Sequence, residues 1–288
     1  MMLDKLSHTC AALWQSLLSL IKIILLSRFF LHKPVCSKEE LSRGIVILGN
    51  GPSLNDTISH AGKFLARHNL LAVNFAACAD IFFSLKPRYY LLADPHFFNA
   101  TDQPNVEKLW QRLSNVDWDM TLFVPARIKT KVDRLASLAG NRHVSIIHYN
   151  TTPVEGLKTI ENLLFSSGLG MPRPRNVLIP SIMMAMQMGY KKIYIAGADH
   201  SWMKTLSVDD DNNVVSIQPH FYKEDDKEIQ RVKTEYMHYP LHTIIYSFYV
   251  AFKSYFTIAR YAKHIGASII NITPGSFIDA FPRENVND

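Results

Sequence analysis

Short apolar runs alternate with longer stretches of helical periodicity along residues 44–288. The runs predicted as strands are residues 45–48, 70–74, 89–93, 121–124, 144–148, 192–197 and 268–272. The helical candidates are residues 55–67, 105–113, 129–138, 176–188 and 241–264. Such alternation is typical of a parallel sheet with helices on both of its faces. The sequence therefore predicts an α/β fold with a mostly parallel sheet.

Residues 1–43 precede this alternation and follow a different pattern. Polar side chains recur there at three- and four-residue steps, on one stripe of a helix: Lys5, His8, Gln15, Ser19 and Lys22. The opposite side is apolar and holds Trp14, Leu17, Leu18, Ile21, Leu25 and Phe29. A basic stripe beside a broad apolar face is typical of a helix that lies in the membrane interface. A helix packed on the protein's own core, or on a second subunit, is the alternative. Residues 34–42 are predicted as a polar linker.

A spanning helix would rarely keep Lys22 near its centre, and no small-residue cleavage site follows the apolar run, which argues against a signal peptide. We therefore expect an N-terminal segment, residues 1–43, that attaches a second unit, residues 44–288, to the inner face of the cell membrane.

The segment 44–54 reads Gly-Ile-Val-Ile-Leu-Gly-Asn-Gly-Pro-Ser-Leu and joins a predicted strand to a predicted helix. Gly49 and Gly51 let the backbone approach a ligand closely, and free N–H groups of a turn and a helix N-terminus can bind phosphate. Asn50 adds an amide that could bind a ribose or a base. The match to the dinucleotide motif G-x-G-x-x-G is partial, because Leu54 stands at the third glycine. We interpret the segment as a site for a nucleotide-like small molecule; a plain strand-to-helix connection is the alternative.

Polar residues follow five of the predicted strands. They are Asn50, Asn74, the segment Asp94-Pro95-His96, the segment Asp199-His200-Ser201-Trp202, and the segment 273–276, which ends in Ser276. Ligands of open parallel sheets bind beyond the carboxyl ends of the strands. The convergence of these five strand ends predicts one polar cleft.

Residues 201–239 interrupt the α/β alternation and are predicted to form a lid over that cleft. Within them, two short β-type runs flank residues 209–213, which indicates a hairpin. The acidic triplet Asp209-Asp210-Asp211 could in principle bind a metal ion, but it lies at a hairpin tip, so we predict a turn and no metal site.

Composition and charge limit the classes of molecule that the protein is expected to bind. The chain has 288 residues, 48% of them hydrophobic, and a net charge of +6, half of which lies in residues 1–43. No basic stripe with interleaved aromatic residues crosses the body of the chain, so we do not expect it to bind nucleic acid. The cysteines, Cys10, Cys36 and Cys78, have no spacing typical of a disulfide framework or a zinc site. The reducing cytoplasm is the expected compartment.

His242 follows Pro240 at the start of the longest predicted helix. A neutral imidazole there could serve as a general base. A structural histidine in the first turn of the helix is the alternative.

Several blocks, in order along residues 44–282, resemble the bacterial CMP-sialic acid transferases of glycosyltransferase family 42. They are residues 49–54, Asn74, Asp94-Pro95, residues 189–199, the pair Tyr239 and His242, and residues 273–276. The glycine block also resembles the MptE-like domain family, which is related to 6-hydroxymethylpterin diphosphokinase. The chain departs from the transferase pattern at Asp94, where those enzymes carry asparagine, at residues 173–176, and at residues 200–202.

The transferase resemblance implies a variant Rossmann-like fold and a metal-independent, inverting transfer from a CMP-sugar. It implies His242 as the base and Tyr239 near the leaving phosphate. The residues expected to bind the donor are Gly49, Asn50, Gly51, Pro52, Ser53, Asn74, Asp94, Pro95, Asn176, Gly197, Asp199, His200 and Ser276. The expected acceptor is a cell-surface glycan or its lipid-linked precursor, as in lipopolysaccharide or capsule synthesis, and no cofactor is expected.

Two other functions stay open at the level of sequence. A diphosphokinase would need ATP with Mg²⁺ held by Asp94 and Asp199, and it would act on a pterin-like alcohol. A nucleotide-binding component of a polysaccharide assembly complex would have no catalytic activity. The sequence also leaves room for a homo-oligomer.

Overall fold

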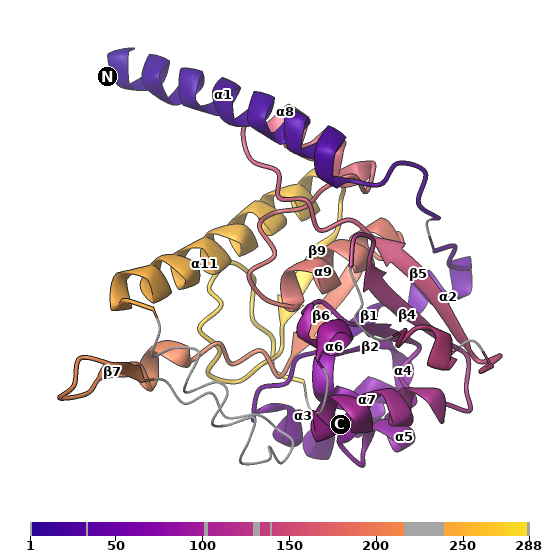
Figure 1. The fold of residues 1–288 in the computed structure, drawn as a ribbon. Coiled ribbons are helices and arrows are strands. Elements are labelled where there is room, and N and C mark those ends of the chain that lie inside the picture. The colour runs from indigo at the N-terminus through magenta and orange to yellow at the C-terminus, as the bar shows by residue number, and fades with distance from the viewer. Residues whose placement is uncertain are drawn as a thin grey trace.

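The computed structural model describes residues 2–32, 34–100, 103–128, 133–138, 140–215 and 239–286, with side chains from residue 7 onward. Its centre is a seven-stranded sheet in the order β5-β4-β3-β2-β1-β6-β9, in which every neighbouring pair is parallel (Figure 1). The strands are β1 (Ile45–Leu48), β2 (Asn69–Val73), β3 (Tyr89–Leu91), β4 (Met120–Pro125), β5 (Val144–Tyr149), β6 (Lys192–Ala196) and β9 (Ser268–Asn271). All seven predicted strands and the α/β fold class are confirmed.

The order of the strands reverses beside β1. The chain moves outward from β1 to β5 on one side, then crosses back to place β6 and β9 on the other side. β1 therefore pairs with β2 along one edge and with β6 along the other, with Leu48 level with both Ala72 and Ala196. In open parallel sheets, ligands bind beyond the carboxyl ends of the strands at such a reversal of strand order.

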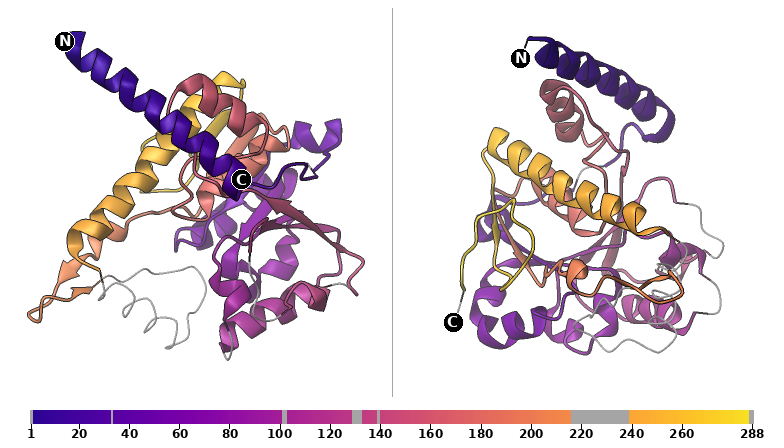
Figure 2. Two further views of the ribbon diagram at one scale, coloured as in Figure 1. Left: turned by 45° about the horizontal axis from the view of Figure 1, so that its top comes forward. Right: turned by 90° about the vertical axis from the view of Figure 1, so that its left-hand side faces the viewer.

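Helices cover both faces of the sheet (Figure 2). The helices α3 (Leu54–His60), α4 (Gly62–Arg67), α5 (Phe82–Leu85), α6 (His96–Asn99) and α7 (Pro104–Ser114) contribute side chains to the core on one face. On the other face the core is built from α8 (Lys158–Ser166), α9 (Leu178–Gln187) and α11 (Leu241–His264). Alternate residues of β1 belong to the two cores, Ile47 to one and Val46 to the other, as the period of a strand requires.

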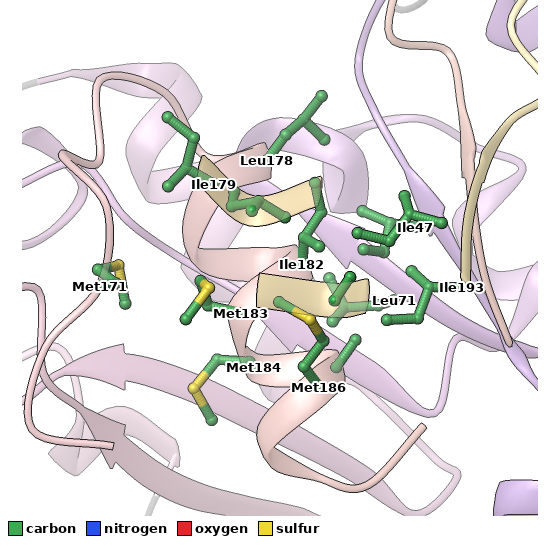
Figure 3. Close-up of a cluster of buried hydrophobic side chains, with 14 of the residues drawn as sticks. Ile47, Leu71, Met171, Leu178, Ile179, Ile182, Met183, Met184, Met186 and Ile193 are labelled. Carbon is green, nitrogen blue, oxygen red and sulfur yellow. The ribbon is translucent and has the colours of Figure 1, made fainter. Parts of the chain in front are cut away.

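Helix α9 lies at the centre of its layer and is apolar all round. Its Ile182 and Met186 lie against Ile47 of β1, Leu71 of β2 and Ile193 of β6 (Figure 3). All residues from Leu178 to Met186 are buried. This packing fixes the N-terminus of α9 at the carboxyl edge of the central strands.

Several predicted boundaries were wrong. Residues 55–67 form two helices, α3 and α4, because the backbone at Ala61 leaves the helical region (φ −129°, ψ 33°) just before Gly62. The predicted linker contains α2 (Lys38–Arg43), whose first turn is closed by a capping box between Ser37 and Glu40. Of the helix predicted over 129–138, the described part contains only a 3₁₀ turn, Ala136–Leu138.

The hairpin predicted in the insert is confirmed as β7 (Ser207–Val208) and β8 (Val214–Val215), which pair antiparallel. Asp209 closes the turn, because its Oδ1 accepts the N–H groups of Asp211 and Asn213. The triplet is exposed, as a turn requires. Residues 216–238, most of the predicted lid, lie outside the described residues, so the lid stays a prediction.

The predicted N-terminal helix is confirmed as α1 (Met2–Leu26). Residues Ser7–Leu26 have a mean hydropathy of 1.8 in their most apolar window, and are long and apolar enough to cross a membrane. The predicted polar stripe is not exposed along its whole length, because Ser19 is fully buried against the body of the protein, whereas Gln15 is exposed.

Candidate functional site

A cavity of about 220 Å³ lies at the carboxyl ends of β1, β2 and β6, where the strand order reverses. Its lining comes from four segments that are far apart in the sequence. They are Gly49, Asn50, Gly51 and Pro52 after β1, Asn74 after β2, Asn176, Val177 and Leu178 at the start of α9, and Gly197, Asp199, His200, Ser201, Trp202, Lys204 and Thr205 after β6. Nine of the predicted donor-binding residues are therefore brought together in one cavity.

The glycines of the β1 turn pack against the loop after β6, a contact that the sequence did not reveal. The N–H of Gly49 donates to Ala196 O at 2.7 Å, and that of Gly51 donates to Gly197 O at 2.8 Å. A Cβ on Gly51 would lie 1.9 Å from Asp199 Oδ2. The expectation that these two N–H groups are free to bind phosphate was wrong, because the loop after β6 already occupies them. The glycines instead let the two loops pack backbone against backbone.

Three asparagines that line the cavity each have one buried side-chain polar atom with no hydrogen-bond partner among the described residues. Asn50 donates its Nδ2 to Val73 O at 3.2 Å, while its Oδ1 is buried and has no partner. The Oδ1 of Asn74, on a residue with φ +49°, is also buried and unpaired. Asn176 accepts the N–H of Leu178 on its Oδ1, and its buried Nδ2 has no partner. Each such atom costs about 1–3 kcal/mol unless something binds it, so the three amides mark a place built for a polar ligand.

His200 belongs to a buried chain of hydrogen bonds. Its Nε2 lies 2.6 Å from Tyr255 Oη, and that hydroxyl donates to Asn176 Oδ1 at 3.0 Å. Because the single hydroxyl proton goes to Asn176, the Nε2–H of His200 must be the donor to Tyr255. The Nδ1 of His200 then carries a lone pair and forms no hydrogen bond with the described residues.

Burial lowers the pKa of His200 to about 3, so its imidazole is neutral at physiological pH. Burial also raises the pKa of Tyr255, which keeps its hydroxyl as a proton donor. A histidine that resists protonation is a poor acceptor of a proton from a substrate. His200 is therefore suited to accept a hydrogen bond from a ligand and to hold Asn176 in place.

Charged and aromatic groups complete the wall. Asp199 accepts the hydroxyl proton of Ser53 at 2.7 Å, so this carboxylate braces the β1 loop. Lys204 is exposed and lies 5.1 Å from the ring of Phe277. The ring of Trp202 packs on that of His200 with centroids 4.2 Å apart and the two planes tilted by 36°. An amide-rich cavity with one cation and one indole can bind a ligand that combines hydroxyl groups, a flat ring and a phosphate.

The other predicted site residues do not line this cavity. Ser53 lies behind it, on Asp199. Asp94 and Pro95 are exposed, and the Asp94 carboxylate accepts the N–H of His96 at 2.8 Å. Ser276 is buried and donates to Ala198 O at 2.6 Å, which supports the β6 loop from the far side.

Tyr239 and His242 are exposed at the start of α11 and are not among the cavity-lining residues. The implied base His242 therefore does not share this cavity with the implied donor-binding residue Asn50 in the described part of the chain. The cavity is nevertheless linked to α11, because Trp202 packs on Phe248 with centroids 5.4 Å apart. The role of His242 as a base stays a prediction.

Lys204 and Tyr255 were missed as site residues, and Trp202, although it stands at the predicted strand end, was not assigned to the donor. Lys204 lies two residues after Trp202, and extending the strand-end argument that far would have found it. Tyr255 lies 55 residues from His200 in the middle of α11, where no local pattern sets it apart.

The described residues contain no group of three His, Cys, Asp or Glu side chains that could hold a metal ion. Arg173, in the segment 173–176 that departs from the transferase pattern, pairs with Glu155 through two hydrogen bonds of 2.9 and 2.7 Å. All three cysteines are free.

No family model matches the chain, and no curated protein matches its sequence. Among solved structures, the MAf glycosyltransferase from Magnetospirillum magneticum AMB-1 is similar to it, with a TM-score of 0.49 and 14% identity over 98% of this chain. The chain spans 38% of the length of that protein. At this identity and TM-score, the likeness by itself says nothing about the activity of the chain.

Proposed function

We propose that the chain is a glycosyltransferase that takes an acidic sugar from a CMP-activated donor. The observation that carries the proposal is the convergence of three unpaired asparagine atoms, from Asn50, Asn74 and Asn176, on one cavity at the switch point of a parallel sheet. Nucleotides bind at such points in this class of sheet. The motif order shared with CMP-sialic acid transferases supports the choice of donor.

The unpaired atoms match the groups that a nucleotide offers. The Oδ1 atoms of Asn50 and Asn74 would accept from ribose hydroxyls or from an exocyclic amino group. The Nδ2 of Asn176 would donate to a carbonyl or a phosphate oxygen. Lys204 would neutralise phosphate charge, and Trp202 presents a flat apolar surface to a base or a sugar.

The chemistry then requires one base for the acceptor hydroxyl. A CMP-sugar carries its own leaving group, so the protein has to orient the donor, exclude water and accept one proton. We keep His242 in that role and Tyr239 beside the leaving phosphate, on the resemblance alone. His200 is the less suitable base, because its pKa is lowered to about 3 by burial.

The diphosphokinase alternative finds less support. It needs two carboxylates beside the nucleotide phosphates to hold Mg²⁺. Asp199 lines the cavity, but Asp94 is exposed and its carboxylate accepts a local backbone N–H. Within the described residues, the two carboxylates do not share the cavity.

Ligand-dependent thermal stability tests the proposal. At a hundredfold excess over Kd, a ligand adds about 2.7 kcal/mol to stability, which for a domain of this size raises Tm by about 5 °C or more. We expect that rise with CMP and not with AMP or ATP, and we expect it to survive EDTA. Asn50→Ala and Asn176→Ala should abolish it, while the exposed Asn285→Ala serves as the matched control.

The outcomes separate the candidate functions. A rise with ATP that depends on magnesium would replace the proposal with the diphosphokinase. A CMP effect without transfer from any CMP-sugar to a glycan or lipid-linked acceptor would leave a nucleotide-binding component of an assembly complex. No nucleotide effect at all would refute the assignment of the cavity.

A further inference from the structure

The side of α1 that faces the body of the protein carries Ser16, Ser19 and Ile23, of which Ile23 packs into the main hydrophobic core, and Ser27 follows just past the end of the helix. Ser16, Ser19 and Ser27 are 3%, 0% and 2% exposed. Ser19 Oγ donates to Glu155 O at 2.7 Å and accepts the N–H of Glu155 at 2.9 Å. Ser16 Oγ accepts the N–H of Leu157 at 2.8 Å. The small serines allow close contact with the segment that leads into α8, over which α1 lies in Figure 2.

The opposite side of α1 is apolar and faces outward. Its side chains include Leu13, Trp14, Leu17, Ile21, Ile24 and Leu25, with exposed fractions from 44% to 69%. We call these six residues the outer face of α1. The usual arrangement of an amphipathic helix, with its apolar side on the protein core, is thus inverted. A contiguous apolar patch of this kind marks a binding surface.

Charge indicates what binds there. No acidic residue occurs between Asp4 and Glu39 in the sequence. Lys22 lies within α1, beside the outer face, and Arg28 follows the end of the helix. The arm continues into Phe29 and Phe30, which are 48% and 99% exposed. Apolar and aromatic side chains on an arm that has basic but no acidic residues match an anionic lipid surface.

We propose that the outer face of α1 lies in the interface of an anionic bilayer, with the helix axis parallel to the membrane plane. A spanning orientation of Ser7–Leu26 would take Ser16 and Ser19 away from the backbone groups of Glu155 and Leu157 and leave those groups unpaired. The proposal concerns a surface apart from the cavity and does not depend on the proposed donor.

Vesicle binding of the full chain tests this orientation. We expect the protein to float with vesicles of phosphatidylcholine that contain phosphatidylglycerol, and to bind pure phosphatidylcholine at least tenfold more weakly. High salt should weaken the binding. The double variant Leu17→Ser/Ile24→Ser changes two exposed side chains, so it should fold normally and bind at least about tenfold more weakly. Met203→Ser/Val208→Ser, which alters similarly exposed apolar residues far along the chain, is the matched control and should bind as the wild type does.

A second readout is the fluorescence of Trp14, obtained by subtracting the signal of a Trp14→Phe variant. It should shift to shorter wavelength with anionic vesicles only. Equal binding by the double variant and the wild type would overturn the proposal. So would a wild-type dimer that the double variant dissociates and that does not bind vesicles, because the outer face would then be a contact between copies.

Discussion

The buried imidazole of His200 makes the stability of the protein depend on pH in a direction that can be worked out. Burial lowers the pKa of His200 to about 3 in the folded protein, whereas a histidine in an unfolded chain titrates near ~6.5. Because the folded-state pKa is the lower one, its contribution to stability is complete above the unfolded-state pKa. It is lost as the pH falls below that value, since the unfolded chain then binds a proton that the folded protein refuses.

Between pH 7 and pH 5 this loss amounts to about 2 kcal/mol. The magnitude is set by the unfolded-state pKa, because pH 5 still lies well above the pKa of about 3 that His200 has in the folded state. Urea unfolding of the wild type and of His200→Gln at both pH values measures it. Glutamine can still donate to Tyr255, so the variant should fold.

We expect the wild type to lose about 2 kcal/mol more than His200→Gln on going from pH 7 to pH 5. The variant at exposed His242, His242→Gln, controls for the exchange of a histidine on the surface. Equal losses in the wild type and in His200→Gln would show that the imidazole of His200 can be protonated where it lies, and would refute the reasoning about its burial.

Three further outcomes follow from the same geometry. Gly51→Ala should lower the free energy of unfolding, measured by urea titration, by about 1–3 kcal/mol, because the new Cβ would lie 1.9 Å from Asp199 Oδ2. Gly140→Ala is the control and should change the free energy of unfolding little, because the space around Gly140 is open. Tyr255→Phe should lower the free energy of unfolding by about 1–3 kcal/mol and weaken CMP binding, because it removes the hydroxyl that pairs with His200 Nε2 and Asn176 Oδ1. If calorimetry shows unchanged CMP affinity, these hydrogen bonds do not contribute to the site. His242→Ala should lower kcat of sugar transfer about a hundredfold or more with little change in donor affinity; steady-state kinetics that show full activity would exclude it as the base.

The seven strands could be predicted because each is a short, mainly apolar run. The central strand β1 is buried at all four of its positions, whereas the edge strand β5 keeps an exposed Ser145. The same reasoning placed Asn50, Asn74 and Asp199 at strand ends. Asp94 and Ser276 met that criterion too, but they do not line the cavity. Asp94 does not reach the cavity because its strand, β3, is separated from β1 by β2. Ser276 does not reach it because its side chain points inward and donates to Ala198 O.

The sequence by itself determined the elements, the parallel sheet and the polar character of the central strand ends, because these depend on periodicity and on residues close together in the chain. The tertiary structure decided the rest. It set the glycines of the β1 turn against the β6 loop, joined His200 to Tyr255, and turned the serines of α1 inward. These outcomes depend on which distant part of the chain each residue contacts. A pattern of polar and apolar residues indicates that a face will be buried, but it does not indicate which residues will cover that face.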